Sequence, residues 1–269
     1  MRFGICVYRD DIPSAERAGY DFVELTVTNV LPDVGVQEYR RLKEQLKSFS
    51  LKPEAWRRFI PPDLHVVGPT VDLPKLTEFM RITMGRISEL GGEVIVFGSP
   101  ISRNVPEGFS RDKARQQLIR FLQTAADIAK HNNLVIVLEP IIRSNCNVLN
   151  TISETFSLYC DVARREIKML ADLYHMSGNL EPPQAVEQTG DSLFHVHMPI
   201  PEIPGLNEPR AINTILPNYP IEAFLRSLKK IGFDNRISIE DLDRKFMNLD
   251  REASIVLSHV RRTWEDLAL

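Results

Sequence analysis

Short apolar segments alternate with helical patterns along almost the whole chain, and this alternation constrains the fold more than any other feature. Apolar runs bounded by small turn residues predict buried strands, and apolar stripes with a period near 3.6 residues predict amphipathic helices. The predicted strands cover residues 2–7, 21–25, 51–57, 94–99, 134–139, 167–172, 193–198 and 236–240. The predicted helices cover about 13–18, 36–49, 73–90, 111–131, 152–164, 181–189, 220–231 and 249–266.

Strands that alternate with helices indicate an α/β protein with a parallel sheet. The chain alternates eight times within 269 residues, and no part of it differs in composition as a second domain would. This pattern predicts closure into a single (β/α)8 TIM barrel that spans residues 1–269. Barrels of this kind hold their active sites at the C-terminal ends of the strands. The residues at these strand ends are therefore the first candidates for function.

Four residues with metal-binding side chains each end a predicted strand in the second half of the chain: Glu139, Asp172, His197 and Glu240. The strands are consecutive and parallel, so the four side chains converge at one face of the barrel. Taken singly, each residue could equally form an ordinary salt bridge or turn contact at a strand end. Three carboxylates this close together repel one another unless a cation neutralises them. The joint pattern predicts a divalent metal site.

An oxygen-rich ligand set with one imidazole suits Mn²⁺, Mg²⁺, Co²⁺ or Fe²⁺, and Zn²⁺ is also compatible with it. No cysteine lies near these residues in the sequence, so we expect no structural zinc site with thiolate ligands. Four protein ligands leave two positions of an octahedral ion open. Two open positions are enough to chelate adjacent oxygens of an α-hydroxy ketone.

Three further residues are candidates for the same face. His195 and His197 are two residues apart, so on a strand they share a face, with His195 the deeper of the two. A hydrogen-bonded core histidine is an equally good interpretation of His195. Glu24 ends the second predicted strand and should face the site as a contact to the substrate, and Trp56 is a candidate apolar wall for the substrate. For Glu24 and Trp56, a role in packing or at the surface is about equally consistent with the sequence.

Composition narrows the range of partners and compartments. The net charge is −3 and there is no basic block, which weighs against nucleic acid as a partner. No apolar run approaches the ~20 residues needed to cross a membrane, and the first residues lead into a strand without a signal-peptide pattern. The three cysteines are scattered and do not suggest a disulfide framework. These features predict a soluble, cytoplasmic protein without a membrane or nucleic-acid partner.

Residues 199–220 interrupt the alternation, with six prolines and no helical stripe. A connection of this length without regular structure is usually functional or disordered. It leaves directly from the strand that bears His197. We interpret it as a substrate-covering loop or a subunit contact, with a merely irregular connection as the alternative.

The motifs in the second half resemble those of the xylose isomerase-like barrels grouped as sugar phosphate isomerases/epimerases. The nearest likeness is to the ketose 3-epimerase branch, typified by D-tagatose 3-epimerase and D-psicose 3-epimerase. The likeness rests on Glu139-Pro140-Ile141-Ile142-Arg143, Asp172-Leu173-Tyr174-His175-Met176 and His195-Val196-His197.

The resemblance implies one divalent metal ion, Mn²⁺, Co²⁺, Mg²⁺ or Zn²⁺, held by the four strand-end residues named above. It places the substrate-contacting histidine of the family on His175 and its arginine on Arg210. Where the family has a second glutamate after the fifth strand, this chain has Asn145, which can hydrogen-bond a hydroxyl but lacks the carboxylate. This departure from the family pattern lies in the part of the site that would hold the sugar, whereas the four metal ligands match the family.

The implied activity is that of a divalent-metal-dependent isomerase or epimerase that acts on a small sugar, in a protein expected to be a homo-oligomer. Glu139 and Glu240 would bracket C3 of a ketose, so that one removes its proton and the other returns a proton on the opposite face. The reaction would pass through a metal-stabilised enediolate. Aldose–ketose isomerisation needs the same residues. The sequence specifies neither the sugar, nor its phosphorylation, nor the metal.

Three other functions remain open. A metal-dependent dehydratase that acts on an inosose or a dehydroshikimate-like acid begins with the same proton abstraction. An apurinic-site endonuclease of the endonuclease IV type needs a zinc cluster and more histidines than the six present, and the acidic balance of the chain disfavours it. A non-catalytic barrel that only binds a sugar does not require two opposed carboxylates.

Overall fold

Eight parallel strands form a closed barrel in the computed structural model, which describes residues 1–203, 206, 219–241, 246 and 248–267. Each strand pairs with the next one along the chain, and β1 pairs with β8 to close the sheet. The strands are β1 Arg2–Cys6, β2 Phe22–Thr26, β3 Pro53–Arg57, β4 Val94–Phe97, β5 Val135–Leu138, β6 Ile167–Asp172, β7 Leu193–Pro199 and β8 Arg236–Glu240. The predicted (β/α)8 barrel is confirmed.

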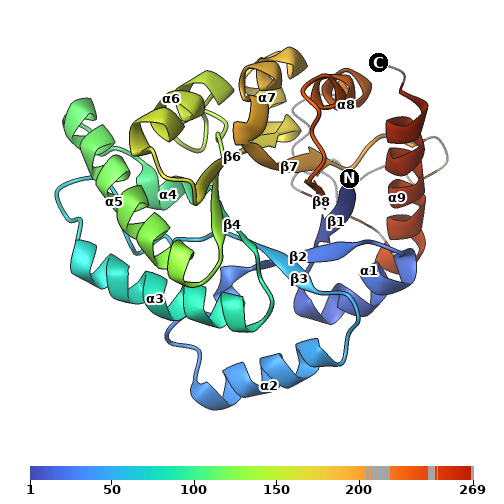
Figure 1. The fold of residues 1–269 in the computed structure, drawn as a ribbon, viewed down its shortest axis with the longest axis horizontal. Coiled ribbons are helices and arrows are strands. Elements are labelled where there is room, and N and C mark those ends of the chain that lie inside the picture. The colour runs from blue at the N-terminus through green and yellow to red at the C-terminus, as the bar shows by residue number, and fades with distance from the viewer. Residues whose placement is uncertain (204–205, 207–218, 242–245, 247, 268–269) are drawn as a thin grey trace.

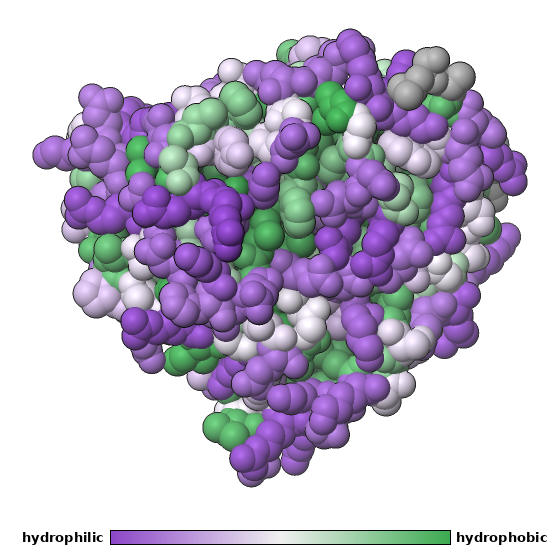
Figure 2. All heavy atoms as spheres, viewed as in Figure 1, coloured by the Kyte–Doolittle hydropathy of each residue, from purple (hydrophilic) through white to green (hydrophobic). Residues whose placement is uncertain are grey.

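Helices surround the barrel and cover its outer face (Figure 1). They are α1 Ile12–Ala18, α2 Val36–Lys47, α3 Leu73–Glu89, α4 Pro100–Arg103, α5 Arg111–His131, α6 Ile152–Val162, α7 Leu173–Gly178, α8 Ile221–Lys230 and α9 Leu249–Asp266. Hydrophilic side chains predominate on the face shown in Figure 2, as expected of helices whose apolar stripes face a sheet. Within the described part of the chain, no helix combines the length and the apolar character needed to span a bilayer.

One predicted helix is wrong, and two short α-helices, α4 and α7, were not predicted. The segment expected to be helical over 181–189 forms a 3-10 helix at Pro183–Gln188, which begins after Pro182. Two consecutive prolines lack the N–H groups that would bond within a longer α-helix. The unexpected helix α7 begins directly after β6, because the side chain of Asp172 accepts hydrogen bonds from the backbone N–H groups of Tyr174 and His175. The predicted loop 199–220 falls largely outside the described residues.

The barrel interior is apolar in its middle and charged at both ends. A cluster of Phe22, Ala55, Val94, Val96, Val137 and Leu170 fills the middle. At the N-terminal end, Glu54 accepts from Arg2 at 2.5 Å and from Arg236 at 2.9 Å, and both guanidinium groups lie over the ring of Phe22. Both cations, the half-buried Arg2 and the buried Arg236, are paired, so this end is closed by charge-assisted hydrogen bonds.

Gly4 of β1 leaves the space that the ring of Phe22 occupies. A Cβ added at Gly4 would lie 2.3 Å from two ring carbons, far inside van der Waals contact. The missing side chain therefore allows a large aromatic residue to fill the interior between β1 and β2. Close packing of this kind tolerates little added volume.

We predict that Gly4→Ala lowers the free energy of unfolding by ~1–3 kcal/mol, because overpacking forces the Phe22 ring or the strand to move. The matched control is Gly85→Ala in α3, where the nearest atom to an added Cβ is 4.0 Å away. That change should raise stability by up to ~1 kcal/mol, since alanine is the better helix former. Chemical denaturation followed by circular dichroism measures both. Equal midpoints for wild type and Gly4→Ala would contradict the prediction.

Candidate metal centre

Four buried side chains meet at the C-terminal end of the barrel around one imidazole nitrogen. Nδ1 of His197 lies 2.9 Å from Oε2 of Glu240, 3.1 Å from Oε1 of Glu139 and 3.9 Å from Oδ2 of Asp172. One ligand atom from each of the four residues lies within 4.8 Å of the others. The residues come from the ends of β5, β6 and β8 and from β7. The parallel register thus brings together the quartet that the sequence singled out.

The two oxygens of Asp172 have different roles. Oδ1 accepts from the N–H groups of Tyr174 and His175 and so fixes the carboxylate at the start of α7. Oδ2 is buried and has no hydrogen-bond partner among the described residues. Burial, with the nearby charges of Glu139 and Glu240, raises the pKa of Asp172 well above its usual value. An unpartnered buried oxygen that faces two carboxylates and an imidazole is the arrangement a divalent cation would complete.

Neighbouring charges shift the pKa values of His197 and Glu240 in opposite directions. Burial lowers the pKa of His197, but the carboxylates of Glu24 and Glu240 outweigh this effect and raise it well above its usual value. Burial raises the pKa of Glu240, but His197 and Arg57 together lower it to about 2. These directions favour a protonated imidazole beside an ionised Glu240. A metal ligand must be deprotonated, so an ion bound here would replace that proton.

Glu24 lies one layer deeper than the quartet and holds the imidazole in place. Its carboxylate is fully buried, 2.9 Å from Nε2 of His197 and 2.8 Å from Nε2 of His195, and it accepts from Ser238 at 2.7 Å. The bond to Nε2 leaves Nδ1 of His197 facing the other carboxylates. Carboxylates that orient a histidine in this way tune metal sites in many proteins. Glu24 thus supports the site from below, whereas the sequence suggested a substrate contact; His195 is the hydrogen-bonded core histidine.

Trp56 does not face this site, so the expectation of an apolar wall is wrong. Its side chain is fully buried in the layer between the barrel and the helices, and its Nε1 donates to the carbonyl of Pro53 at 2.9 Å. Side chains alternate along a strand. Ala55 belongs to the interior cluster and Arg57 reaches Glu240 across the mouth of the barrel, which leaves Trp56 pointing outward.

The remaining predicted substrate contacts are placed differently. His175 is buried beside the quartet, with Nε2 3.7 Å from Oδ2 of Asp172, and its Nδ1 has no partner in the described part of the chain. Burial lowers its pKa. Asn145 is exposed on the loop after β5, where its Oδ1 accepts from Ser144 at 3.2 Å. Arg210 lies outside the described residues.

Two arginines that the sequence did not assign to the site hold its glutamates. Arg57, at the end of β3, donates from Nη1 to Oε1 of Glu240 at 2.7 Å. Arg103 of α4 is fully buried and donates from Nη2 to the backbone carbonyl of Glu139 at 2.7 Å and from Nη1 to that of Phe97 at 3.0 Å. The position of Arg57 at the end of a predicted strand could have identified it as a residue of the site. Arg103 lies in a short helix that no sequence pattern marked.

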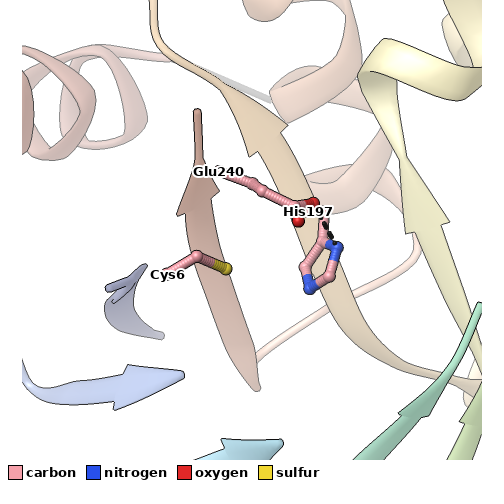
Figure 3. Close-up of side chains that lie close together, drawn as sticks. All are labelled: Cys6, His197 and Glu240. Atoms are coloured by element: carbon pink, nitrogen blue, oxygen red, sulfur yellow. Dashed lines mark ion pairs between the residues drawn. The ribbon is translucent and has the colours of Figure 1, made fainter. Parts of the chain in front are cut away.

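Cys6 also belongs to this region, which corrects the expectation that no cysteine lies near a ligand. It ends β1, and its sulfur shares a group of potential ligand atoms with His197 and Glu240, all within 4.8 Å of one another (Figure 3). Burial, followed by the charge of Glu24, raises the pKa of its thiol. The residue is far from the others in sequence and becomes their neighbour only because β1 and β8 pair.

The comparisons with known proteins agree with this architecture. The family model described as xylose isomerase-like TIM barrel matches residues 12–262, and the chain belongs to this family. An L-ribulose 3-epimerase from Methylomonas sp. strain DH-1 is 25% identical over 262 residues, which covers 96% of this chain and 86% of the relative. The resemblance predicted from the motifs is thereby confirmed.

Two other similar proteins extend the comparison. An inosose isomerase from Bacillus velezensis is 21% identical over 254 residues, which covers 92% of this chain and 88% of the relative. The crystal structure of D-psicose 3-epimerase with D-tagatose from Clostridium cellulolyticum H10 superimposes with a TM-score of 0.80 at 17% identity, and covers 98% of this chain and 99% of that one. The structural likeness shows a shared fold.

We predict that Glu24→Gln weakens binding of Mn²⁺ by roughly 10–100-fold, because a glutamine amide no longer offers carboxylate oxygens to both histidines. Isothermal titration calorimetry on protein freed of metal measures the affinity. Glu89→Gln, on the exposed side of α3, is the control and should bind Mn²⁺ like wild type. Unchanged affinity in Glu24→Gln would show that Glu24 does not orient His197 for a metal.

Proposed function

We propose that this protein is a divalent-metal-dependent sugar epimerase or isomerase, and that it epimerises a ketose at C3. The observation that carries the proposal is the meeting of Glu139 and Glu240, from β5 and β8, at the same nitrogen of His197. The family and the relatives named as L-ribulose 3-epimerase and inosose isomerase support a substrate of the carbohydrate class. The substrate is then a small molecule that enters at the C-terminal end of the barrel.

The metal would be held by Glu139, Asp172, His197 and Glu240. When bound, the ion supplies a Lewis acid that polarises the ketose carbonyl and the neighbouring hydroxyl. The ion would be Mn²⁺, Co²⁺, Mg²⁺ or Zn²⁺. The unpartnered Oδ2 of Asp172 and the orientation of His197 by Glu24 support this ligand set.

The two glutamates act on the proton at C3 from opposite faces of the sugar. One carboxylate removes the proton, and the other carboxylic acid returns a proton to the far side, which inverts the centre. Arg57 anchors one oxygen of Glu240, and the buried Arg103 anchors the backbone of Glu139, so both groups are held by cations. Fixed positions matter because small displacements of a catalytic group reduce the rate strongly.

His175 donates a hydrogen bond to the substrate oxygen on which negative charge develops. Its burial lowers its pKa, so the ring is neutral near pH 7 and donates from an uncharged N–H. Asn145 and Arg210 stay predictions as further contacts to the sugar. Neutral donors are sufficient here, because the ion would carry the compensating positive charge.

We predict that wild type, loaded with Mn²⁺ or Co²⁺, incorporates deuterium from solvent at C3 of at least one free ketohexose, and that Glu240→Gln exchanges at least ~100-fold more slowly. A neutral amide cannot accept or return the proton. Nuclear magnetic resonance follows the exchange, and mass spectrometry of the protein reports its metal content.

Glu89→Gln serves again as the control and should exchange at the wild-type rate. A variant that retains its ion but loses exchange assigns Glu240 to proton transfer, whereas loss of both assigns it to metal binding as well. A metal-loaded wild type that exchanges no ketose proton would refute the proposed chemistry and leave the barrel with a different activity.

A further inference from the structure

Cys6 lies where the two ends of the barrel sheet meet. In the pairing of β1 with β8, Ile5 is opposite Ile239, so the next residues along the two strands are Cys6 and Glu240. Cys6 is 5% exposed, and its sulfur points toward the space between Glu240 and His197 (Figure 3). No hydrogen bond to this sulfur is found among the described residues. A buried thiol that faces an imidazole and a carboxylate has the surroundings of a metal ligand.

The three side chains offer one sulfur, one nitrogen and one oxygen. Thiolate is a soft ligand that prefers Zn²⁺ and its heavier relative Cd²⁺ over Mg²⁺ and Mn²⁺. Three protein ligands with an open fourth position are the usual composition of an accessible tetrahedral zinc site. Ligand atoms on one such ion lie roughly 3.3–3.7 Å apart, given bond lengths of ~2.0–2.3 Å. Ligand atoms already within 4.8 Å of one another need only small side-chain rotations to reach this geometry.

We propose that Cys6, His197 and Glu240 form a second metal site, which takes a thiophilic divalent ion such as Zn²⁺ or Cd²⁺. Arg57 supports it, because its bond to Oε1 of Glu240 leaves Oε2 directed at His197. The site overlaps the oxygen-rich set and lies closer to β1. The proposal concerns ion binding alone and does not depend on the sugar chemistry.

Two ligands are common to both sets, so the two ions exclude each other. An oxygen-preferring ion uses Glu139 and Asp172 together with His197 and Glu240, whereas a thiophilic ion draws the shared pair toward Cys6. The chain therefore discriminates between hard and soft ions by position. A thiophilic ion should displace Mn²⁺ from the protein.

The direct test is titration of the metal-free protein with Cd²⁺, followed by the ultraviolet charge-transfer absorption of the cadmium–thiolate bond. We expect the band to saturate at one equivalent of Cd²⁺ in wild type and to be absent in Cys6→Ala. Cys160→Ala, which removes an exposed cysteine, is the matched control and should keep the band. Thermal unfolding checks that Cys6→Ala is folded, and Cys6→Ser, close to cysteine in size, provides a second variant that should also lose the band.

Competition between Cd²⁺ and Mn²⁺ distinguishes the cysteine-containing ligand set from the oxygen-rich set. Cd²⁺ added to Mn²⁺-loaded wild type should release one Mn²⁺ per Cd²⁺ bound, measured by the paramagnetic resonance of free Mn²⁺. Cys6→Ala should need at least ~10-fold more Cd²⁺ for the same release, because losing a direct ligand costs at least as much as losing an outer partner. Asp172→Asn, which alters only the oxygen-rich set, should weaken Mn²⁺ binding and keep the cadmium–thiolate band.

Three results would overturn the proposal: no charge-transfer band in wild type, a band that persists in Cys6→Ala, or a band abolished by Cys160→Ala. A fourth contrary result is loss of the band in folded Asp172→Asn, which would place the ion in the oxygen-rich set. Failure of the ketose-exchange experiment would leave these outcomes unaffected, because the cadmium band requires no sugar.

Discussion

The structure of the site depends on one constraint: three buried carboxyl groups surround a single imidazole nitrogen, with Glu139 and Glu240 at hydrogen-bond distance and Asp172 at 3.9 Å. Carboxylate oxygens within 4.8 Å of one another in a site this buried are unfavourable without a compensating cation. His197 supplies that charge when protonated, and Glu24 beneath it keeps the ring aligned. The single positive charge of the protonated imidazole offsets only part of the repulsion between the carboxylates. A divalent ion in place of the proton would offset more of it. The proposed chemistry follows from this electrostatic arrangement.

Two arginines place positive charge beside the carboxyl groups of the site and stabilise them. Arg57 holds the carboxylate of Glu240, and Arg103, fully buried, holds the backbone of Glu139. Gly98 supplies space in the same region, since an added Cβ would lie 2.0 Å from Oε2 of Glu139. The opposite end of the barrel is closed by Arg2, Arg236 and Glu54. An apolar layer separates the two charged ends, so each keeps its own counter-charges.

Much of the architecture could be predicted from the sequence, because buried parallel strands and amphipathic helices have distinct patterns. The positions of Glu139, Asp172 and Glu240 at strand ends followed from the same patterns, since parallel strands direct their ends to one face. Trp56 was placed wrongly because strand alternation puts Ala55 in the barrel interior and Trp56 in the layer between the barrel and the helices. The local sequence predicts a buried strand there but does not record which of its two faces points inward.

The sequence by itself determined the alternation of strands and helices, the closure that eight repeats imply, and the side chains available at each strand end. Only the tertiary structure decided which of them meet. Cys6 and Glu240 are at opposite ends of the chain and become neighbours through the pairing of β1 with β8. Glu24 was seen at a strand end, but its place beneath His197 depends on the depth of each residue in the barrel. Local patterns report burial and periodicity, whereas contacts across a closed sheet depend on strand register, which only the assembled barrel specifies.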